Sequence, residues 1–429
     1  MMGQHQKQEE LWAKDYDLIK RIPEDNVLRK LKQILDLDFV RHEVGGFYGV
    51  NGQVSVDPVQ ILKMMLLLFL EDVASERELM RTIPLRIDYL WFLGFSLEDQ
   101  IPNHSVLSKA RTKWGYDVFE RLFKSTVEQC WRAGLIDGRK VHVDSSMVRA
   151  NASLDSVVKI TVDKLDGDEE TPVKGTNAQY RSTTDPEATL TRHRGGQSSP
   201  SYQVHRALDD AHGVITAVET TTGTVNEAHK MVDLIADHTE QVGMVPEAVV
   251  ADCKYGISAN FIAMGQAGIR SHMGDLRARL KIHKMEGIYE QDRFVYDPQT
   301  DTYQCPAGEQ LKRRRYVESR GHYEYQTAIG VCRDCSLRSL CTKDKEGRTL
   351  KRYPEQELLD QARRQSNSPE AVADRKKRQW LVEGVFGLGA VHHGMKRARW
   401  RGLWKQAIQD YLIAGVQNLL ILLRKGLAA

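Results

Sequence analysis

The spacing of apolar residues changes near Gly138, and this change divides the sequence into two regions with different secondary structure. Before Gly138, apolar residues such as Val59, Leu62 and Leu66 recur at the spacing of one helix face. Directly after it, Lys140–Asp144 alternates polar and apolar residues, which is the pattern of a strand. The chain must therefore combine a helical region with a region that contains a sheet.

Start signals and apolar runs locate the helices of the first region. Asp57 followed by Pro58 marks a helix start, because an Asp side chain caps free backbone amides and Pro suits the first helical position. The apolar run Ile61–Leu70 is too short to cross a bilayer, which takes about 20 apolar residues. It predicts a buried helix, and residues 116–133 predict a longer amphipathic one.

The signals after Gly138 follow the order of an α/β layer fold. Residues 160–200 are rich in Thr, Ser, Gly, Pro and charge, so we expect a long loop there. Tyr202–Leu208 and Val214–Thr220 flank a turn and predict a hairpin. Residues 228–242 predict a helix, and the apolar Ala248–Ala251 predicts a buried strand.

Three acidic residues occupy positions that suit divalent metal ions. We expect Asp144 and Asp252 at the ends of two strands and Glu383 on a helix. Strand ends in α/β sheets meet at one rim, and carboxylates are ligands for Mg²⁺ or Mn²⁺. A pair of such ions can activate an attacking hydroxyl and stabilise the leaving oxygen at phosphorus. Among 58 acidic residues, Asp at a strand end is also common as a cap, so spacing alone leaves both interpretations open.

The residues around these carboxylates resemble the motifs of bacterial insertion-sequence DDE transposases. The similar segments are Val143–Ser146, Ala251–Gly256 and Val382–Gly387, together with Ser182–Glu187 and Asn103–Ser108. They keep the order of that family and cover nearly the whole chain.

This resemblance implies a ribonuclease-H-like catalytic core with an all-helical N-terminal domain before it and a small Cys-containing, β-rich insertion. The expected regions are a DNA-binding region at 1–137, the core at 138–274, the insertion at 275–355 and a helical part at 356–429 that carries the catalytic Glu. It also implies two Mg²⁺ or Mn²⁺ ions held by Asp144, Asp252 and Glu383, which act in strand cleavage and strand transfer at element ends.

The sequence departs from the family pattern beside Glu383. Gln379 stands where the family often has Arg, and Ala390 stands where it often has Lys; Arg378 and Lys396 are candidates to replace them. Three interpretations stay open: an active transposase, a catalytically impaired DNA-binding protein derived from one, and a nuclease that cuts without joining.

Cations gather around Glu383. Residues 375–405 hold nine Lys or Arg and a single acidic residue, a distribution suited to DNA phosphates, although a solvated helix face has the same pattern. We predict DNA contacts for Arg375, Lys376, Arg378, Lys396, Arg397 and Arg399. For Trp380, Trp400 and Trp404 we expect packing in the core.

Four cysteines have the spacing C-x26-C-x2-C-x5-C at Cys305, Cys332, Cys335 and Cys341. Four thiolates would form a closed structural zinc site. The last spacing is irregular for a zinc ribbon, so four reduced thiols remain an equal alternative.

The expected partners are DNA, as element terminal repeats and target DNA, and a second copy of the chain in a synaptic complex; no membrane partner is expected. The polar start of the chain has no secretion signal, which predicts a cytoplasmic location at the bacterial nucleoid.

Overall fold

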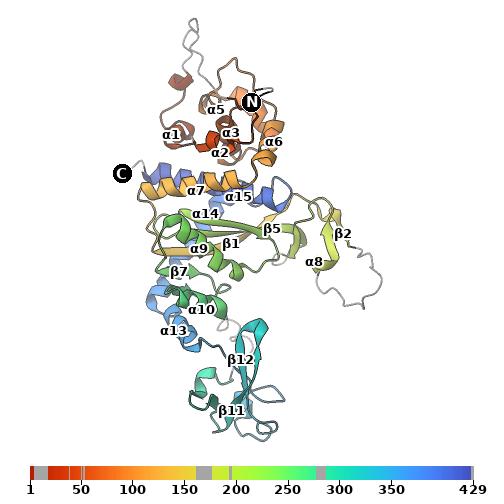
Figure 1. Ribbon diagram of the computed structural model, residues 1–429, viewed down its shortest axis with the longest axis vertical. Coiled ribbons are helices and arrows are strands. Elements are labelled where there is room, and N and C mark those ends of the chain that lie inside the picture. The colour runs from red at the N-terminus through yellow and green to blue at the C-terminus, as the bar shows by residue number, and fades with distance from the viewer. Residues whose placement is uncertain are drawn as a thin grey trace. The chain divides into compact units, whose positions relative to one another are not determined.

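The computed structural model describes residues 1–3, 18–37, 39–49, 51, 54–160, 176–192, 196–276 and 287–426. It divides into two compact units (Figure 1). The first unit combines Met1–Val250 with Lys376–Ala429, and the second is Ala251–Arg375.

The first unit begins with short helices, as the sequence predicts. Asp57 caps α3, because its carboxylate accepts a hydrogen bond from the Val59 amide at 2.9 Å, and most residues of the run Ile61–Leu70 are buried. Among the described residues, no helix is long and apolar enough to cross a membrane. The elements are η1 (Leu18–Arg21), α1 (Val27–Ile34), α2 (Phe39–Gly45), α3 (Pro58–Leu70), α4 (Glu76–Thr82), η2 (Ile83–Leu85), α5 (Ile87–Leu93), α6 (Ser105–Trp114) and α7 (Asp117–Arg132).

A sheet forms the centre of the first unit. Strands β1 (Lys140–Arg149), β5 (Ser198–Asp209) and β6 (Ile215–Thr222) pair as an antiparallel meander, and β4 (Thr189–Arg192) pairs with β5. After η4 (Glu227–Lys230) and α9 (Met231–Val242), the chain returns as β7 (Ala248–Ala251), parallel to β1. The order β6-β5-β1-β7 is the ribonuclease-H-like arrangement, so the predicted α/β core with helices before it is confirmed.

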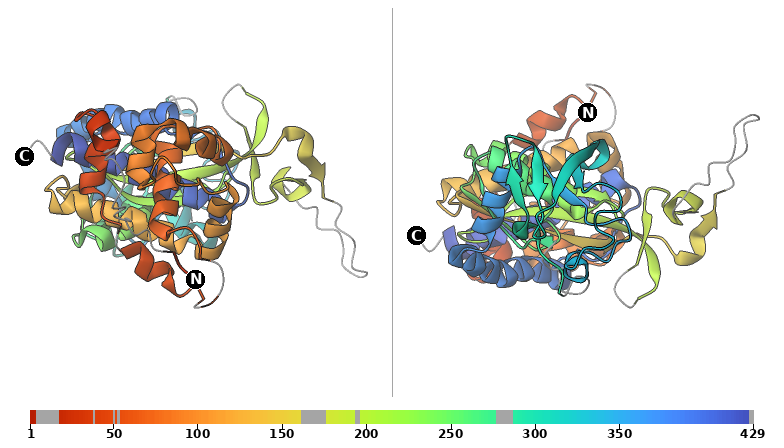
Figure 2. Two further views of the ribbon diagram at one scale, coloured as in Figure 1. Left: turned by 90° about the horizontal axis from the view of Figure 1, so that it is seen from above. Right: turned by 90° about the horizontal axis from the view of Figure 1, so that it is seen from below.

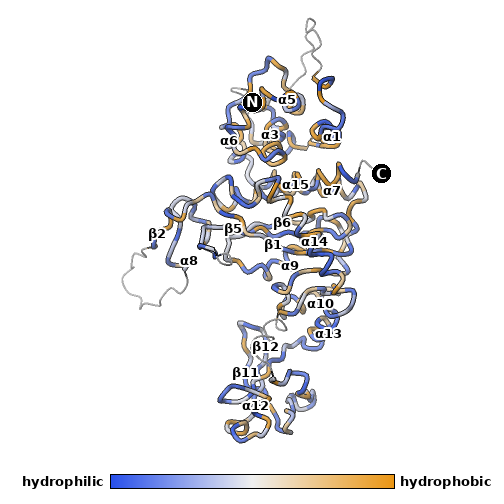
Figure 3. The backbone as a smooth tube through the Cα atoms, turned by 180° about the vertical axis from the view of Figure 1, so that it is seen from behind, coloured by the Kyte–Doolittle hydropathy of each residue, from blue (hydrophilic) through white to orange (hydrophobic). Residues whose placement is uncertain are grey.

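Helices cover this sheet. After α14 (Pro369–His392), α15 (Leu403–Ile421) packs against β6, α3 and α7, and it continues as η7 (Leu422–Gly426). Figure 3 shows apolar residues gathered along α15 and the neighbouring β6. One hydrophobic core therefore joins the N-terminal helices to the sheet.

Strand β1 is longer than the sequence predicts. The strand continues to Arg149 because the residues after Asp144 pair with β5, from Ser145↔His205 to Arg149↔Ser201. Placing Asp144 at the end of a strand was therefore wrong. Asp144 lies two residues past the last pair between β1 and its parallel neighbour, His142↔Val250.

Part of the expected loop at 160–200 is also structured. After η3 (Leu154–Ser156), β2 (Val157–Lys159) pairs with β3 (Tyr180–Ser182), which follows α8 (Thr176–Gln179). This two-stranded ribbon projects to one side of the first unit (Figure 2). Residues 161–175 and 193–195 lie outside the described residues.

The second unit has two parts. In the first, α10 (Ser258–Gln266) and β8 (Arg270–Met273) pack against α13 (Gln356–Ser366). In the second, an antiparallel sheet has the order β13-β12-β11-β10-β9. Its elements are η5 (Gln291–Arg293), β9 (Val295–Asp297), β10 (Thr302–Gln304), β11 (Gln310–Val317), η6 (Glu318–Arg320), β12 (His322–Gln326), α12 (Arg338–Cys341) and β13 (Leu350–Arg352).

Candidate active site

Asp144 lies in β1, directly opposite Arg206 of β5. Its side chain is about half-buried, and its Oδ2 atom is 2.7 Å from the guanidinium of Arg378 on α14. Its Oδ1 atom accepts a hydrogen bond from the Ser145 amide at 2.8 Å. A positive charge from the helix that carries Glu383 therefore balances the Asp144 carboxylate.

A second cation comes from the segment that follows α14. Lys396 donates a hydrogen bond to Ser146 Oγ at 2.5 Å. Backbone bonds fix this segment beside β1: the Arg149 amide donates to the Lys396 carbonyl at 2.9 Å, and the Ala398 amide donates to the Arg149 carbonyl at 2.7 Å. The structure thus brings Arg378 and Lys396, two of the cations singled out in the sequence, to the same stretch of β1.

Arg206 joins three elements beneath this stretch. It is fully buried, it donates to Gln417 Oε1 of α15 at 2.8 Å, and its guanidinium lies 5.2 Å from the Phe386 ring of α14. Gln417 in turn donates to the Val385 carbonyl at 2.7 Å. Burial lowers the pKa of Arg206 to about 10, although the charge of Asp410 opposes this shift. Arg206 was not predicted from the sequence; its signal is an Arg at one of the alternating positions that are otherwise apolar, Tyr202, Val204 and Leu208.

Glu383 lies on an exposed face of α14. Its neighbours Val382 and Val385 are buried, whereas Trp380, three residues before it, is 63% exposed. The expectation that Trp380 packs in the core was wrong, because helical spacing puts it on the same side as Glu383. Core packing is confirmed for Trp400 and Trp404, which are partly buried against the hydrophobic core.

Asp252 directly follows β7, as the sequence predicts. It is partly buried, and its Oδ1 atom accepts a hydrogen bond from the Lys254 amide at 2.8 Å. Asp252 belongs to the second unit, whereas Asp144 and Glu383 belong to the first.

The other cations predicted to contact DNA differ in their surroundings. Lys376 and Arg397 are exposed. Arg375 donates to the Ser366 carbonyl at 2.6 Å, and Arg399 is ion-paired with Asp72 at 2.8 Å with only 14% of its side chain exposed. Arg375 and Arg399 are therefore engaged in contacts within the protein.

Two polar networks that the sequence did not reveal hold β1 and its neighbours. Ser145 donates to the buried carboxylate of Glu227 and accepts from Gln203 at 2.8 Å. Asp210 accepts from Lys377 at 2.6 Å and lies 2.7 Å from His142 Nε2. Burial acts to raise the pKa of Asp210, but these two partners hold it at about 2.

In the second unit, His272 of β8 lies close to two acids at the start of α14. His272 Nδ1 is 2.6 Å from Asp374 Oδ2, and both side chains are buried. Glu370 completes a group whose possible metal-ligand atoms lie within 4.8 Å of one another. Glu370 is also paired with Arg270 of β8 at 2.7 Å. We therefore interpret this group as a set of polar contacts that connects β8 to α14.

Two family models match the chain. A transposase domain model (DUF772) matches residues 16–113, and a transposase DDE domain model matches residues 304–423, a range that includes Glu383. None of the curated proteins is significantly similar to the chain.

Solved structures of transposases show remote similarity. A piggyBac transposase synaptic complex with hairpin DNA is 10% identical, with a TM-score of 0.38 over 93% of this chain and 75% of that one. A Mos1 transposase paired-end complex with the left transposon end is 11% identical, with a TM-score of 0.18 over 54% of this chain and 64% of that one.

Proposed function

The chain belongs to the DDE transposase family, and from this premise we propose that it cuts DNA at the ends of an insertion sequence and joins them to target DNA. The observation that most supports this proposal is the ion pair between Arg378 and Asp144. Arg378 precedes Glu383 by five residues on α14, or about 7.5 Å along the helix axis. The ion pair therefore brings the helix that carries Glu383 against the strand that carries Asp144.

We propose that Asp144, Asp252 and Glu383 hold divalent ions of the Mg²⁺ or Mn²⁺ type. Their carboxylates are hard donors, Asp144 and Asp252 are partly exposed, and Glu383 is exposed. Bound ions would activate the attacking hydroxyl and stabilise the leaving oxygen. Arg378 would release Asp144 when ions replace its charge there, and its guanidinium would then be free to contact a DNA phosphate.

The surface around Glu383 suits DNA. Lys376, Lys396 and Arg397 are exposed and can neutralise phosphates. Arg378 and Lys396 would take the place of the cations that the family often has at Gln379 and Ala390. Trp380, on the exposed face of α14, offers a ring on which an unpaired base of the cleaved end can stack. We propose that two copies of the chain hold two element ends in a synaptic complex on nucleoid DNA.

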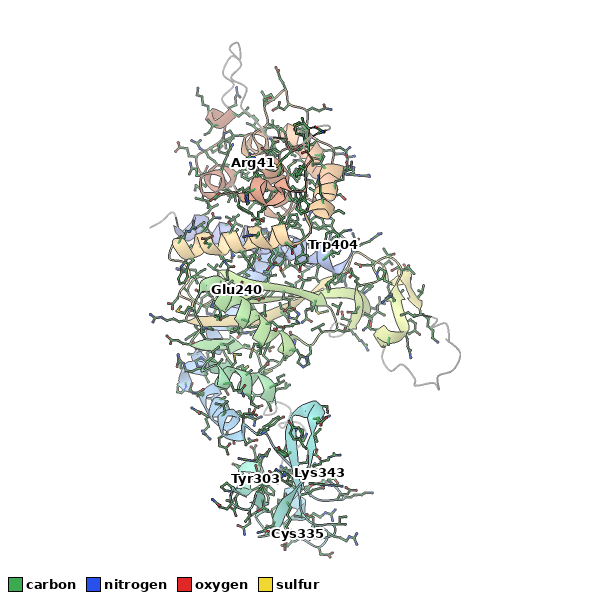
Figure 4. All side chains as sticks on the ribbon, in the orientation of Figure 1. Arg41, Glu240, Tyr303, Cys335, Lys343 and Trp404 are labelled. Atoms are coloured by element: carbon green, nitrogen blue, oxygen red, sulfur yellow. The ribbon has the colours of Figure 1, made fainter. Side chains whose placement is uncertain are left out.

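The test is cleavage and joining of labelled DNA that carries the sequences flanking the gene, with Mg²⁺ or Mn²⁺. We expect Asp144→Asn, Asp252→Asn and Glu383→Gln to abolish both steps while DNA binding persists. The matched control is Glu240→Gln, an exposed acid on α9 that Figure 4 labels, which should keep full activity.

Other outcomes of this assay would support the alternative functions or exclude the metal site. Wild-type binding without cleavage would indicate the DNA-binding derivative, and cleavage without joining would indicate a nuclease. Activity that survives EDTA, or that survives in all three carboxylate variants, would overturn the metal assignment.

A further inference from the structure

We propose that Cys305, Cys332, Cys335 and Cys341 bind one structural zinc ion in the second unit. The four residues come from separate places along the chain: Cys305 follows β10, Cys332 and Cys335 lie in the segment after β12, and Cys341 ends α12. All four nevertheless line one cavity of about 30 Å³, and none of them forms a disulfide. A space of this size holds a single small occupant.

The backbone forms turns at Cys305 and Cys335. The Gly308 amide donates to the Cys305 carbonyl at 2.8 Å, and Gly308 has a φ of +88°, which Gly adopts readily. The Arg338 amide donates to the Cys335 carbonyl at 3.1 Å. These turns fix the backbone at two of the four cysteines that line the cavity.

Apolar groups and two cations also line the cavity. Its lining includes Tyr289, Phe294 and Leu311, together with Arg338 and Arg348. Arg348 donates to the carbonyls of Cys341 and Tyr289, each at 3.2 Å. Zinc with four thiolates carries a net charge of −2, so two adjacent guanidiniums give charge balance.

The hydrophobic core of this part of the second unit is small. The buried core of its sheet consists of five residues: Phe294, Tyr303, Leu311, Tyr325 and Leu350. Residues 327–349, between β12 and β13, contain a single short helix, α12. A module with so small a core and so long a connection usually depends on a disulfide or a metal. None of the four cysteines forms a disulfide, so a metal ion is the support that we propose for this module.

The donor set selects the metal and its role. Thiolates are soft ligands, and four of them lining one cavity favour zinc or an iron–sulfur cluster over Mg²⁺. We favour zinc over a cluster because one zinc ion with four thiolate ligands needs the least space in this small cavity. Because four protein ligands complete its coordination, the ion would hold structure rather than take part in catalysis. This zinc site therefore does not depend on the proposed DNA cleavage and joining.

The test is the metal content of the full-length protein, purified without added metal or chelator and measured by plasma mass spectrometry. We expect one zinc per chain in the wild type and a loss to background in Cys335→Ser and Cys341→Ser. Cys253→Ser is the matched control, because Cys253 lies outside the cavity, and it should keep its zinc. Iron in place of zinc, absence of zinc, or equal zinc in all variants would overturn the proposal.

If the cysteine variants fail to fold, a second measurement tests the site in the wild-type protein. Cobalt replaces zinc in wild-type protein, and four thiolates should give thiolate-to-metal charge-transfer bands in the near ultraviolet and intense tetrahedral bands in the red. Cys335→His, which supplies an alternative ligand, should keep the metal with shifted bands. Chelation should expose residues 327–349 to proteolysis, and zinc should restore their protection. Octahedral cobalt bands would refute the site. A rate of proteolysis that changes with neither chelator nor zinc would also refute it.

Discussion

Asp410, a fully buried carboxyl group on α15, should destabilise the protein at neutral pH. Burial raises its pKa from 3.8 to about 6, although hydrogen bonds from Thr220 and Gln406 and the charge of Arg206 oppose the shift. At about 1.4 kcal/mol per pKa unit, this rise corresponds to about 3 kcal/mol. The folded state thus binds a proton that the unfolded state has already released, so stability falls as pH rises from about 4 to about 6.

Asp410→Asn should remove this penalty. The Thr220 hydroxyl can still donate to the amide oxygen, and a flipped Gln406 amide can accept from the new amide group, since Gln406 Oε1 is buried without a hydrogen-bond partner. We expect the variant to match the wild type at pH 4 and to exceed it by about 3 kcal/mol in free energy of unfolding at pH 7.

Urea unfolding of both proteins, followed by circular dichroism at pH 4, 5, 6 and 7, measures this difference. Other titrating groups contribute equally to the two proteins and cancel. Asp410→Ala is the contrasting variant, because it leaves a cavity and loses the bond from Thr220. A variant Asp410→Asn that is less stable at pH 7, or a difference that does not change with pH, would refute the reasoning.

Three further substitutions test the site and the second unit. Arg378→Gln removes the cation paired with Asp144, and we expect DNA-end cleavage to fall about tenfold, the effect of one charged hydrogen bond; unchanged cleavage would exclude a phosphate contact. Trp380→Ala should weaken binding of DNA with an unpaired end by about 1–3 kcal/mol in a fluorescence titration. The same change at the exposed Trp131 of α7 should have no such effect. His272→Leu removes the hydrogen-bond partner that lies 2.6 Å from the buried Asp374 and should cost about 1–3 kcal/mol in urea unfolding, whereas a near-neutral result would make the pair dispensable.

Local patterns were sufficient where local chemistry determines the structure. The cap at Asp57 and the buried strand Ala248–Ala251 depend on neighbouring residues, and both are present as predicted. The extension of β1 was missed because Ser145 and Ser146 do not continue an apolar alternation. Their strand conformation comes from pairing with β5, more than 50 residues away in sequence, which no local pattern contains.

The sequence proposed the acids of the candidate site but did not reveal their surroundings. The family motifs identified Asp144 and Glu383 as candidate ligands, and the cation count identified Arg378. The same count could not separate Arg397, which is exposed, from Arg399, which holds Asp72, because charge alone does not reveal a partner. Arg206 was missed for a related reason: burial of an Arg depends on acceptors such as Gln417, supplied by another helix.

The alternation of β1 explains how one strand can serve two purposes. Asp144 and Ser146 point to the side of Arg378 and Lys396, whereas Ser145, between them, points to Gln203 and Glu227. Because successive side chains of a strand alternate between faces, the second network can hold the backbone of β1 without touching the carboxylate. A change at Ser145 would leave the buried Glu227 without its hydroxyl donor and act on stability, while a change at Ser146 would act on Lys396 and the proposed DNA contact.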